Sequence, residues 1–409
     1  MDTQRDNNFY FARQPILNRE NGIVAYELLF RKNTINSLTD YPTNATSQVL
    51  VTALNRMGLQ DIIGDATKAY INISDETLFD ENITTIPTKS FVLEILEDIS
   101  ITPRVVDRVA YLNQKGYTIA LDDIICSDAV IQKIKPLLPY VSIIKLETPQ
   151  DHKQLEKYIP LLKKLKLQIL AEKVETQEQY TYYKDLGCDL FQGYFFARPT
   201  MISGAKIDPK LVNIFRVISE VSSQNNVKDA AYLFETDAAL TFQLLRYINS
   251  ANFSFRSTIK TITQALQLLG PSNLIQWLTL MTYVIESGDG VDSPLLKLAN
   301  ERATIMSSLS GLLKEDVSKD TAAFIGLLSL VDALCKKPMP ELLKHLHIDT
   351  TLQHVLLKKE GSLGALLELV LAVEQQEHKM IDTLLVQLNI PFHDFAYQLS
   401  HSYQQRPKH

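Results

Sequence analysis

The first 200 residues alternate between short apolar segments and segments of helical period, and this alternation restricts the fold more than any other feature. Eight candidate strands are residues 10–16, 23–31, 68–74, 91–95, 118–123, 141–145, 168–172 and 190–193. Helical patterns lie between most of them, at residues 46–59, 103–115, 150–165 and 177–187. Strands that alternate with helices pair in parallel and predict an α/β barrel of the TIM type. Because only the short turn 18–22 separates the first two strands, we expect one antiparallel pair.

Most of the predicted strands end in polar side chains. In the clearest case, the apolar segment 118–121 runs into two adjacent carboxylates, Asp122 and Asp123. The corresponding residues elsewhere are Glu27, Asn72, Glu94, Lys145, Glu172 with Glu175, and Gln192. A single residue of this kind could simply be solvated, but the carboxyl ends of barrel strands share one face, so we expect the set to converge. Carboxylate and amide oxygens bind hard divalent ions, which predicts a site for Mg²⁺ or Mn²⁺.

Composition and charge exclude several other classes of protein. The chain of 409 residues is too long for one ordinary core and predicts two domains. Its net charge of −6 and the absence of a basic stripe argue against a nucleic-acid partner. No apolar segment reaches the roughly 18 residues of a membrane span, and no signal peptide is evident, so we expect a cytoplasmic protein with no membrane partner. Cys126, Cys188 and Cys335 lack the spacing of a metal site and are expected to be reduced thiols.

Eight motifs occur in the same order as in a known family. They are Gln14-Pro-Ile, Tyr26-Glu-Leu-Leu-Phe-Arg, Asn72-Ile-Ser, Leu93-Glu-Ile-Leu-Glu, Leu121-Asp-Asp, Lys145, Ala171-Glu-Lys-Val-Glu-Thr and Phe191-Gln-Gly-Tyr. Together they resemble the motifs of EAL domains, which hydrolyse the bacterial messenger cyclic di-GMP to linear pGpG. The resemblance runs from about residue 8 to residue 200, and the name-giving Glu-Ala-Leu reads Glu27-Leu-Leu29.

This resemblance implies a cyclic di-GMP phosphodiesterase with two divalent metals, Mg²⁺ or Mn²⁺, in bacterial second-messenger signalling. The implied metal ligands are Glu27, Asn72, Glu94, Asp122, Asp123 and Glu172. The implied catalytic residues are Glu172 as ligand or general base, Lys145 beside the nucleophilic water, and Asp123 on the second metal. Gln14, Leu29, Arg31 and Gln192 would contact the substrate, and Glu97 and Glu175 would brace the loops.

Three positions depart from the family pattern. The family's Phe-Gly-Thr-Gly-type loop, which folds over the metals and contributes to a dimer, is replaced by Ile124-Ile-Cys-Ser-Asp128. This segment has no glycine, and its β-branched residues restrict the backbone. The family's Lys-Ile-Asp reads Lys145-Leu-Glu147, and Lys173 stands in place of a glycine. Two hypotheses therefore remain: a metal-dependent phosphodiesterase, which the complete ligand set favours, or an inactive cyclic di-GMP receptor or scaffold.

Beyond Pro199 the sequence changes to long helical periods with almost no strand signal. We expect an EAL-type barrel domain at residues 1–200 and an all-α domain at residues 201–409. The segment Leu240–Phe253, followed by Ile259–Gly270 and an apolar helix, resembles HDOD domains, which are helical relatives of the HD phosphohydrolases.

The metal site of the HD relatives is not expected in this domain. Those enzymes need a histidine and a His-Asp pair, but no histidine occurs between His152 and His345. The pair His393-Asp394 follows a proline and is expected to lie in a turn or at a helix start. We therefore expect the helical domain to be non-catalytic and to bind an unidentified protein partner.

Overall fold

The computed structural model describes residues 9–32, 68–197, 209–224, 227, 230–231, 234, 238–248, 262–287, 293–346 and 349–404. The chain divides into two compact units. The first comprises residues 1–198, 372–385 and 390–409, and the second comprises residues 199–371 and 386–389. Two C-terminal segments thus group with the barrel, whereas the sequence places all residues after 200 in the helical domain.

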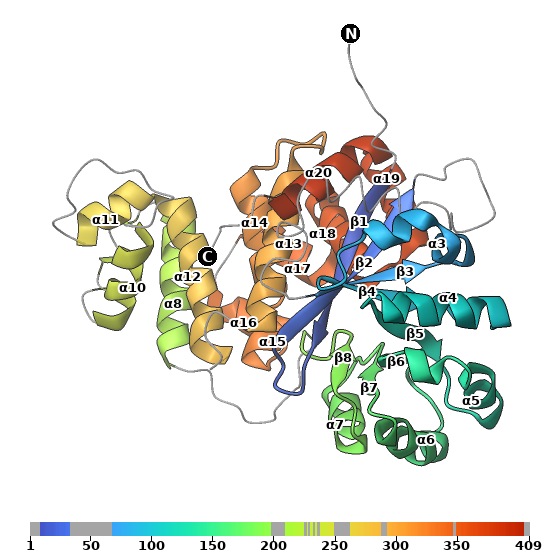
Figure 1. The fold of residues 1–409 in the computed structure, drawn as a ribbon. Helices are drawn as coiled ribbons and strands as arrows, with labels where there is room; N and C mark the ends of the chain where they lie inside the picture. Colours follow the sequence, from blue (N-terminus) through green and yellow to red (C-terminus); the bar gives the residue numbers. More distant parts are fainter. Residues whose placement is uncertain are drawn as a thin grey trace, which may run out of the picture. The chain divides into compact units, whose positions relative to one another are not determined.

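The first unit contains a closed barrel whose strands follow one another in chain order (Figure 1). The strands are β1 (Phe9–Leu17), β2 (Ile23–Lys32), β3 (Lys68–Ile73), β4 (Phe91–Ile95), β5 (Thr118–Ile124), β6 (Ile143–Leu146), β7 (Gln168–Ala171) and β8 (Leu190–Gln192). The predicted barrel with one reversed strand is confirmed. Strand β1 is antiparallel to both β2 and β8, because a single reversed strand in a closed barrel has two neighbours that run the other way.

The turn between β1 and β2 is held by the side chain of Asn18. Its Oδ1 accepts hydrogen bonds from the backbone N–H groups of Glu20 (3.0 Å) and Gly22 (2.7 Å). Asparagine commonly stabilises turns in this way, because its short side chain reaches the backbone two residues on. Asn21 follows with a φ of +61°, in the left-handed region that asparagine tolerates.

An apolar cluster fills the barrel with one buried residue from each strand. Its members are Ile16, Ala25, Tyr70, Val92, Ala120, Ile143, Leu170 and Leu190. In β-strands the side chains at positions i and i+2 lie on the same face. The residues two positions from these apolar ones therefore also point into the barrel interior.

Helices follow most of the parallel strands. They are α3 (Asp75–Phe79), α4 (Pro103–Gln114), α5 (Asp128–Ile134), α6 (His152–Lys164) and α7 (Gln177–Leu186), with short 3₁₀ turns at Glu81–Thr85 and Leu138–Tyr140. The predicted helices at 103–115, 150–165 and 177–187 are confirmed, and the predicted helix at 46–59 lies outside the described residues. Helix α7 begins at a capping box of Thr176 and Gln179 and ends at Gly187, whose φ of +105° requires a glycine.

The last helix, α20 (Phe392–Gln404), packs against β1, which accounts for its grouping with the barrel. The guanidinium of Arg13 on β1 lies 4.1 Å from the ring centre of Tyr26 and 5.2 Å from that of Tyr403 on α20. Arg13 is buried, and these cation–π contacts offset part of its lost hydration.

The described part of the second unit is helical, as predicted. Its helices are α8 (Pro209–Gln224), α10 (Ala238–Ile248), α11 (Ile262–Leu269), α12 (Pro271–Ser287), α13 (Pro294–Ser310), α14 (Lys319–Leu328), α15 (Val331–Cys335), α16 (Met339–Leu346), α17 (Thr350–Lys358) and most of α18 (Gly361–Gln375). Most of the next helix, α19 (His378–Leu388), belongs to the first unit. Helices α13 and α14 cross closely at Gly326, where a Cβ would lie 2.7 Å from the Cα of Ala303. Among the described helices, none has the length and apolar character needed to cross a membrane.

Candidate metal centre

Eight polar side chains, seven on strands and one directly after β7, lie next to the apolar cluster inside the barrel. They are Gln14, Glu27, Asn72, Glu94, Asp122, Lys145, Glu172 and Gln192. On the parallel strands each residue stands two positions after a member of the apolar cluster, and on the reversed strand β1 Gln14 stands two positions before Ile16. Six of these residues lie at or within two positions of the carboxyl ends of their parallel strands, where barrel enzymes place their chemistry, and Glu27 lies in the middle of the longer β2.

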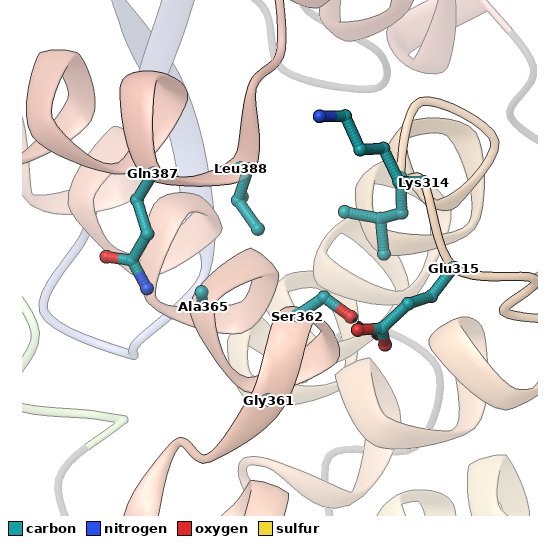
Figure 2. A pocket seen from close by; sticks show the side chains of 8 residues that line it. Lys314, Glu315, Gly361, Ser362, Ala365, Gln387 and Leu388 are labelled. Atoms are coloured by element: carbon teal, nitrogen blue, oxygen red, sulfur yellow. Dashed lines mark hydrogen bonds between the residues drawn. The ribbon is translucent and has the colours of Figure 1, made fainter.

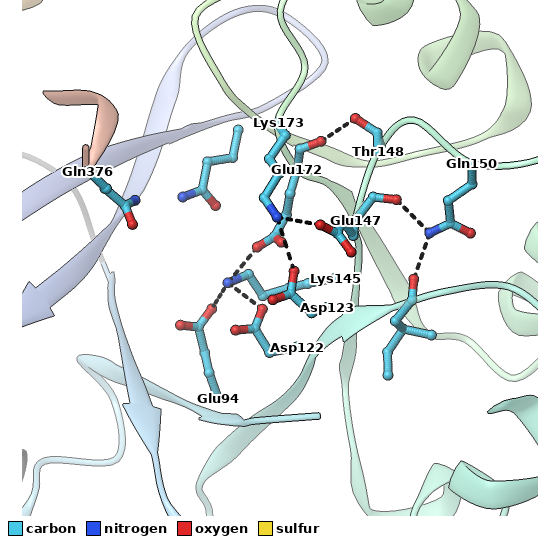
Figure 3. A network of polar contacts seen from close by, with 12 residues as sticks. Glu94, Asp122, Asp123, Lys145, Glu147, Thr148, Gln150, Glu172, Lys173 and Gln376 are labelled. Carbon is cyan, nitrogen blue, oxygen red and sulfur yellow. Dashed lines mark hydrogen bonds and ion pairs between the residues drawn. The ribbon is translucent and has the colours of Figure 1, made fainter. Parts of the chain in front are cut away.

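Lys145 lies at the centre of this polar set (Figure 3). Its Nζ is 2.6 Å from Glu94 Oε1, 2.6 Å from Glu172 Oε1, 2.8 Å from Asp122 Oδ1 and 3.4 Å from Glu27 Oε2. All five side chains are buried. One ammonium group thus faces four carboxyl groups, and a buried surplus of negative charge is unfavourable unless protons or further cations neutralise it.

The pKa values of these groups reflect this surplus. Burial raises the pKa of Glu94 well above its usual range, and Lys145 only partly opposes the effect. Burial likewise raises the pKa of Glu172 to about 8, against the attraction of Lys145 and with added repulsion from Asp122 and Glu27. Burial alone would lower the pKa of Lys145, but its carboxylate neighbours outweigh burial and raise it well above its usual range.

The amide side chains of Gln192 and Asn72 contact the Glu27 carboxylate. Gln192 Nε2 donates to Glu27 Oε2 (2.7 Å) and to Gln14 Oε1 (2.5 Å), and Asn72 Nδ2 approaches Glu27 Oε1 at 3.4 Å. Gln14 Oε1 also accepts a hydrogen bond from Nε2 of Gln376, which follows α18 (3.1 Å). A chain of hydrogen bonds through Gln14 and Gln192 therefore connects Gln376 to Glu27, a predicted metal ligand.

Asp123 lies at the edge of the polar set with a φ of +49°. Its pKa is raised by burial and by Asp122, and Lys173 opposes the rise. The Nζ of Lys173 is 3.8 Å from Asp123 Oδ1 and 2.6 Å from Glu147 Oε1 (Figure 3). Glu147 and Lys173 are two of the departures from the family pattern, and the fold brings them together.

The donor atoms in this region fit a hard divalent ion. Asp122, Asp123 and Glu172 offer carboxylate oxygens that lie within 4.8 Å of one another. Asn72 Oδ1 and Glu94 Oε2 are buried and have no hydrogen-bond partner among the described residues. Buried oxygen atoms normally have a partner, so these two are available as ligands. The set consists entirely of oxygen donors, which suit Mg²⁺ and Mn²⁺.

The loop after Asp123 is held by side-chain hydrogen bonds. The Nε2 of Gln150 donates to the carbonyl oxygens of Ile124 (2.7 Å) and Glu147 (2.6 Å), and its Oε1 accepts from the N–H of Cys126 (2.7 Å). At the end of the loop, Asp128 Oδ1 accepts from Lys157 Nζ (2.6 Å). Gln150 therefore holds the backbone of this glycine-free loop at Ile124 and Cys126, whereas the ion pair of Asp128 is exposed.

The remaining predicted site residues are Leu29, Arg31, Glu97 and Glu175, and no contact with this network is described for them. Leu29 is half-buried on β2, and Arg31 pairs with Tyr10 in the β1–β2 ladder, although its side chain lies outside the described part of the chain. Glu97 and Glu175 are exposed. The Glu97 carbonyl accepts a hydrogen bond from Lys133 Nζ (3.2 Å), and the Glu175 N–H donates to Gln179 Oε1 (2.7 Å).

The sequence reasoning missed Gln150 and Gln376. Gln150 gave no signal because its partners are backbone atoms of a neighbouring loop. Gln376 is 362 residues from Gln14 along the chain, so no local pattern could connect them.

Among the described residues, neither the His393-Asp394 pair nor the cysteines belong to a second group of possible metal ligands. His393 and Asp394 lie in the first turn of α20, as expected, where His393 is exposed and Asp394 is half-buried. His345 and His347 carry no described side chains. Cys126, Cys188 and Cys335 are buried thiols outside any disulfide, and burial raises the pKa of the Cys126 thiol to about 11.

A cavity of about 240 Å³ lies within the second unit and contains none of the predicted site residues (Figure 2). Its lining residues are Leu313, Lys314, Glu315, Gly361, Ser362, Ala365, Gln387 and Leu388. Ser362 donates a hydrogen bond to Glu315 there. The cavity offers no group of carboxylates comparable to that of the barrel.

Comparison with known proteins gives matches over both parts of the chain. Residues 1–199 match the EAL domain family and residues 209–347 match the HDOD domain family. An uncharacterized Bacillus subtilis protein, YuxH, is 30% identical over 374 residues, which cover 89% of this chain and 90% of the relative. The Vibrio cholerae protein named cyclic di-GMP phosphodiesterase CdgJ is 28% identical over 398 residues, which cover 95% of this chain and 90% of the relative.

Solved structures match the barrel region. The EAL domain of Xanthomonas citri FimX, in complex with c-diGMP, aligns with 47% of this chain and 88% of its own, at 15% identity and a TM-score of 0.40.

Proposed function

Because this chain belongs to the family of proteins in which an EAL domain is followed by an HDOD domain, we propose that it is a metal-dependent phosphodiesterase that hydrolyses cyclic di-GMP to pGpG. The observation that carries the proposal is the polar set inside the barrel, in which Lys145 contacts four carboxyl groups at the strand ends. Such a surplus of buried carboxylates has a physical reason to exist if divalent cations bind there.

The proposed ligands are Glu27, Asn72, Glu94, Asp122, Asp123 and Glu172. Two bound Mg²⁺ or Mn²⁺ ions would polarise the phosphodiester and lower the pKa of a coordinated water. Asn72 Oδ1 and Glu94 Oε2, which have no hydrogen-bond partner among the described residues, support this assignment.

Two further groups have properties suited to the reaction. Glu172 is buried beside Asp122 and Asp123, and we assign it as a metal ligand or as the acceptor of the proton from the attacking water. Lys145 carries a fixed positive charge in a dry interior, where it would stabilise negative charge that develops on the phosphate. Gln14, Gln192, Leu29 and Arg31 are proposed to hold the substrate.

A second function is a cyclic di-GMP receptor or scaffold without turnover. The observation that favours it is the loop after Asp123, which lacks glycine and is fixed by Gln150. If closure of this loop is needed for hydrolysis, the barrel could bind the nucleotide without cleaving it. In either case we propose that the HDOD domain binds a protein partner.

The deciding experiment is incubation of the purified full-length chain with cyclic di-GMP and Mg²⁺ or Mn²⁺, with chromatographic detection of pGpG. We expect pGpG from the wild type, none from Glu27→Ala, and wild-type yield from Glu81→Ala, which removes an exposed carboxylate. Calorimetric binding of cyclic di-GMP without any pGpG would support the receptor. Neither binding nor product would refute both functions.

A further inference from the structure

Lys173 and Glu147 replace the family's glycine and aspartate, and they form an ion pair of 2.6 Å beside Asp123. They come from the loops after neighbouring strands β7 and β6. The same Lys173 ammonium lies 3.8 Å from Asp123 Oδ1, as Figure 3 shows. Lys173 supplies a cation at the edge of the metal centre, and Glu147 supplies the carboxylate that pairs with it.

The backbone makes lysine an unfavourable choice at this position. Lys173 has a φ of +53°, in the left-handed region where glycine is free of strain and a side chain is not. A lysine at this position is more strained than a glycine, and only the contacts of its side chain can offset that strain. The described contacts of its ammonium are with Glu147 and Asp123.

We propose that Lys173 is a positioning residue that holds the Asp123 carboxylate and competes with the second divalent ion for it. This inference rests on the proposed metal centre. It adds that Lys173 lowers the affinity of the centre for the more weakly bound of its two divalent ions. A cation within about 4 Å of a ligand oxygen lowers the affinity of that oxygen for another cation. The Lys173 side chain is 55% exposed, so water screens this competition and the ammonium can move aside when the ion binds.

The test is calorimetric titration of Mn²⁺ into the metal-free, full-length protein. Lys173→Met keeps most of the length of the side chain and removes its charge, so we expect it to tighten the weaker Mn²⁺ binding event about three- to tenfold. Lys173→Arg keeps the charge and should stay near the wild type. The matched control is Lys166→Met, since Lys166 is an exposed lysine of the same unit with a similar φ of +63°.

A double-mutant cycle separates competition from a purely structural role. Glu147→Gln frees the ammonium to approach Asp123 and should weaken the second Mn²⁺ event, and this effect should shrink in the Lys173→Met background. Equal Mn²⁺ constants in the wild type and Lys173→Met would overturn the inference and leave the metal centre standing. Absence of Mn²⁺ binding in the wild type and every variant would overturn both.

Discussion

The Nζ of Lys145 lies 2.6 Å from Oε1 of Glu94, and both side chains are almost fully buried. Three more carboxyl groups approach the same ammonium within 3.4 Å. The metal-free barrel therefore depends on one lysine and on protonation of some carboxyl groups to balance its interior charge. This dependence leads to measurable consequences for stability, pH response and metal binding.

Replacement of Lys145 by methionine should destabilise the metal-free protein by about 3 kcal/mol, because it leaves buried carboxylates without their cation. The loss should be smaller at low pH, where the carboxyl groups are protonated. Urea unfolding in the presence of a chelator measures both effects, and Lys166→Met serves as the exposed control. An unchanged free energy of unfolding at neutral pH would mean that Lys145 does not balance these charges.

The metal-free protein should become less stable as pH rises from about 4.5 to 8. In the folded state the pKa of Glu172 is about 8, whereas its usual value is 4.5, so in this window the folded state binds more protons than the unfolded state. The slope of the unfolding free energy against pH has the sign of the number of protons bound by the unfolded state minus the number bound by the folded state. This difference is negative here, so stability falls as pH rises.

Glu172→Gln removes this titration. Over the same pH range, the melting temperature of this variant should therefore fall by roughly 5 °C less than that of the wild type. The measurement is thermal unfolding at several pH values with a chelator present. Parallel curves for the two proteins would contradict the raised pKa of Glu172.

Hydrolysis should depend fully on a divalent ion and be inhibited by Ca²⁺. Ca²⁺ prefers more ligands and longer bonds than Mg²⁺, so it would occupy the carboxylates without the geometry that the reaction requires. Assays with Mg²⁺, with Mn²⁺, with added Ca²⁺ and with excess chelator measure this dependence. Full turnover in chelator would refute the metal centre.

A Phe-Gly-Thr-Gly sequence at residues 124–127 should raise the rate of hydrolysis more than it changes substrate affinity. Glycines allow the loop conformations that close over the metals, whereas the native loop is fixed by Gln150. A displacement of about 1 Å at Asp123 can lower the rate about a hundredfold, which sets the scale of the possible gain.

Steady-state kinetics of the graft and of Gln150→Ala, which removes the hydrogen bonds but keeps the native loop sequence, would separate rate from affinity. If neither variant turns over faster than the wild type, the loop does not limit the reaction.

Much of the barrel and its polar set could be predicted from the sequence, for a local reason. Side chains two positions apart on a strand share a face, and parallel strands in a barrel end on one side. The pattern of Ala120 followed by Asp122, repeated from strand to strand, was therefore enough to predict that carboxylates converge.

Only the tertiary structure decided which of these groups face one another. The position of Lys145 among four carboxyl groups and the pairing of Lys173 with Glu147 depend on strand order and register, which bring residues from separate strands to within 3 Å or so of each other. The grouping of α20 with the barrel and the bond from Gln376 to Gln14 join segments more than 350 residues apart. The local periodicity of the sequence cannot predict such contacts, because they form only when distant segments of the chain come together in the folded state.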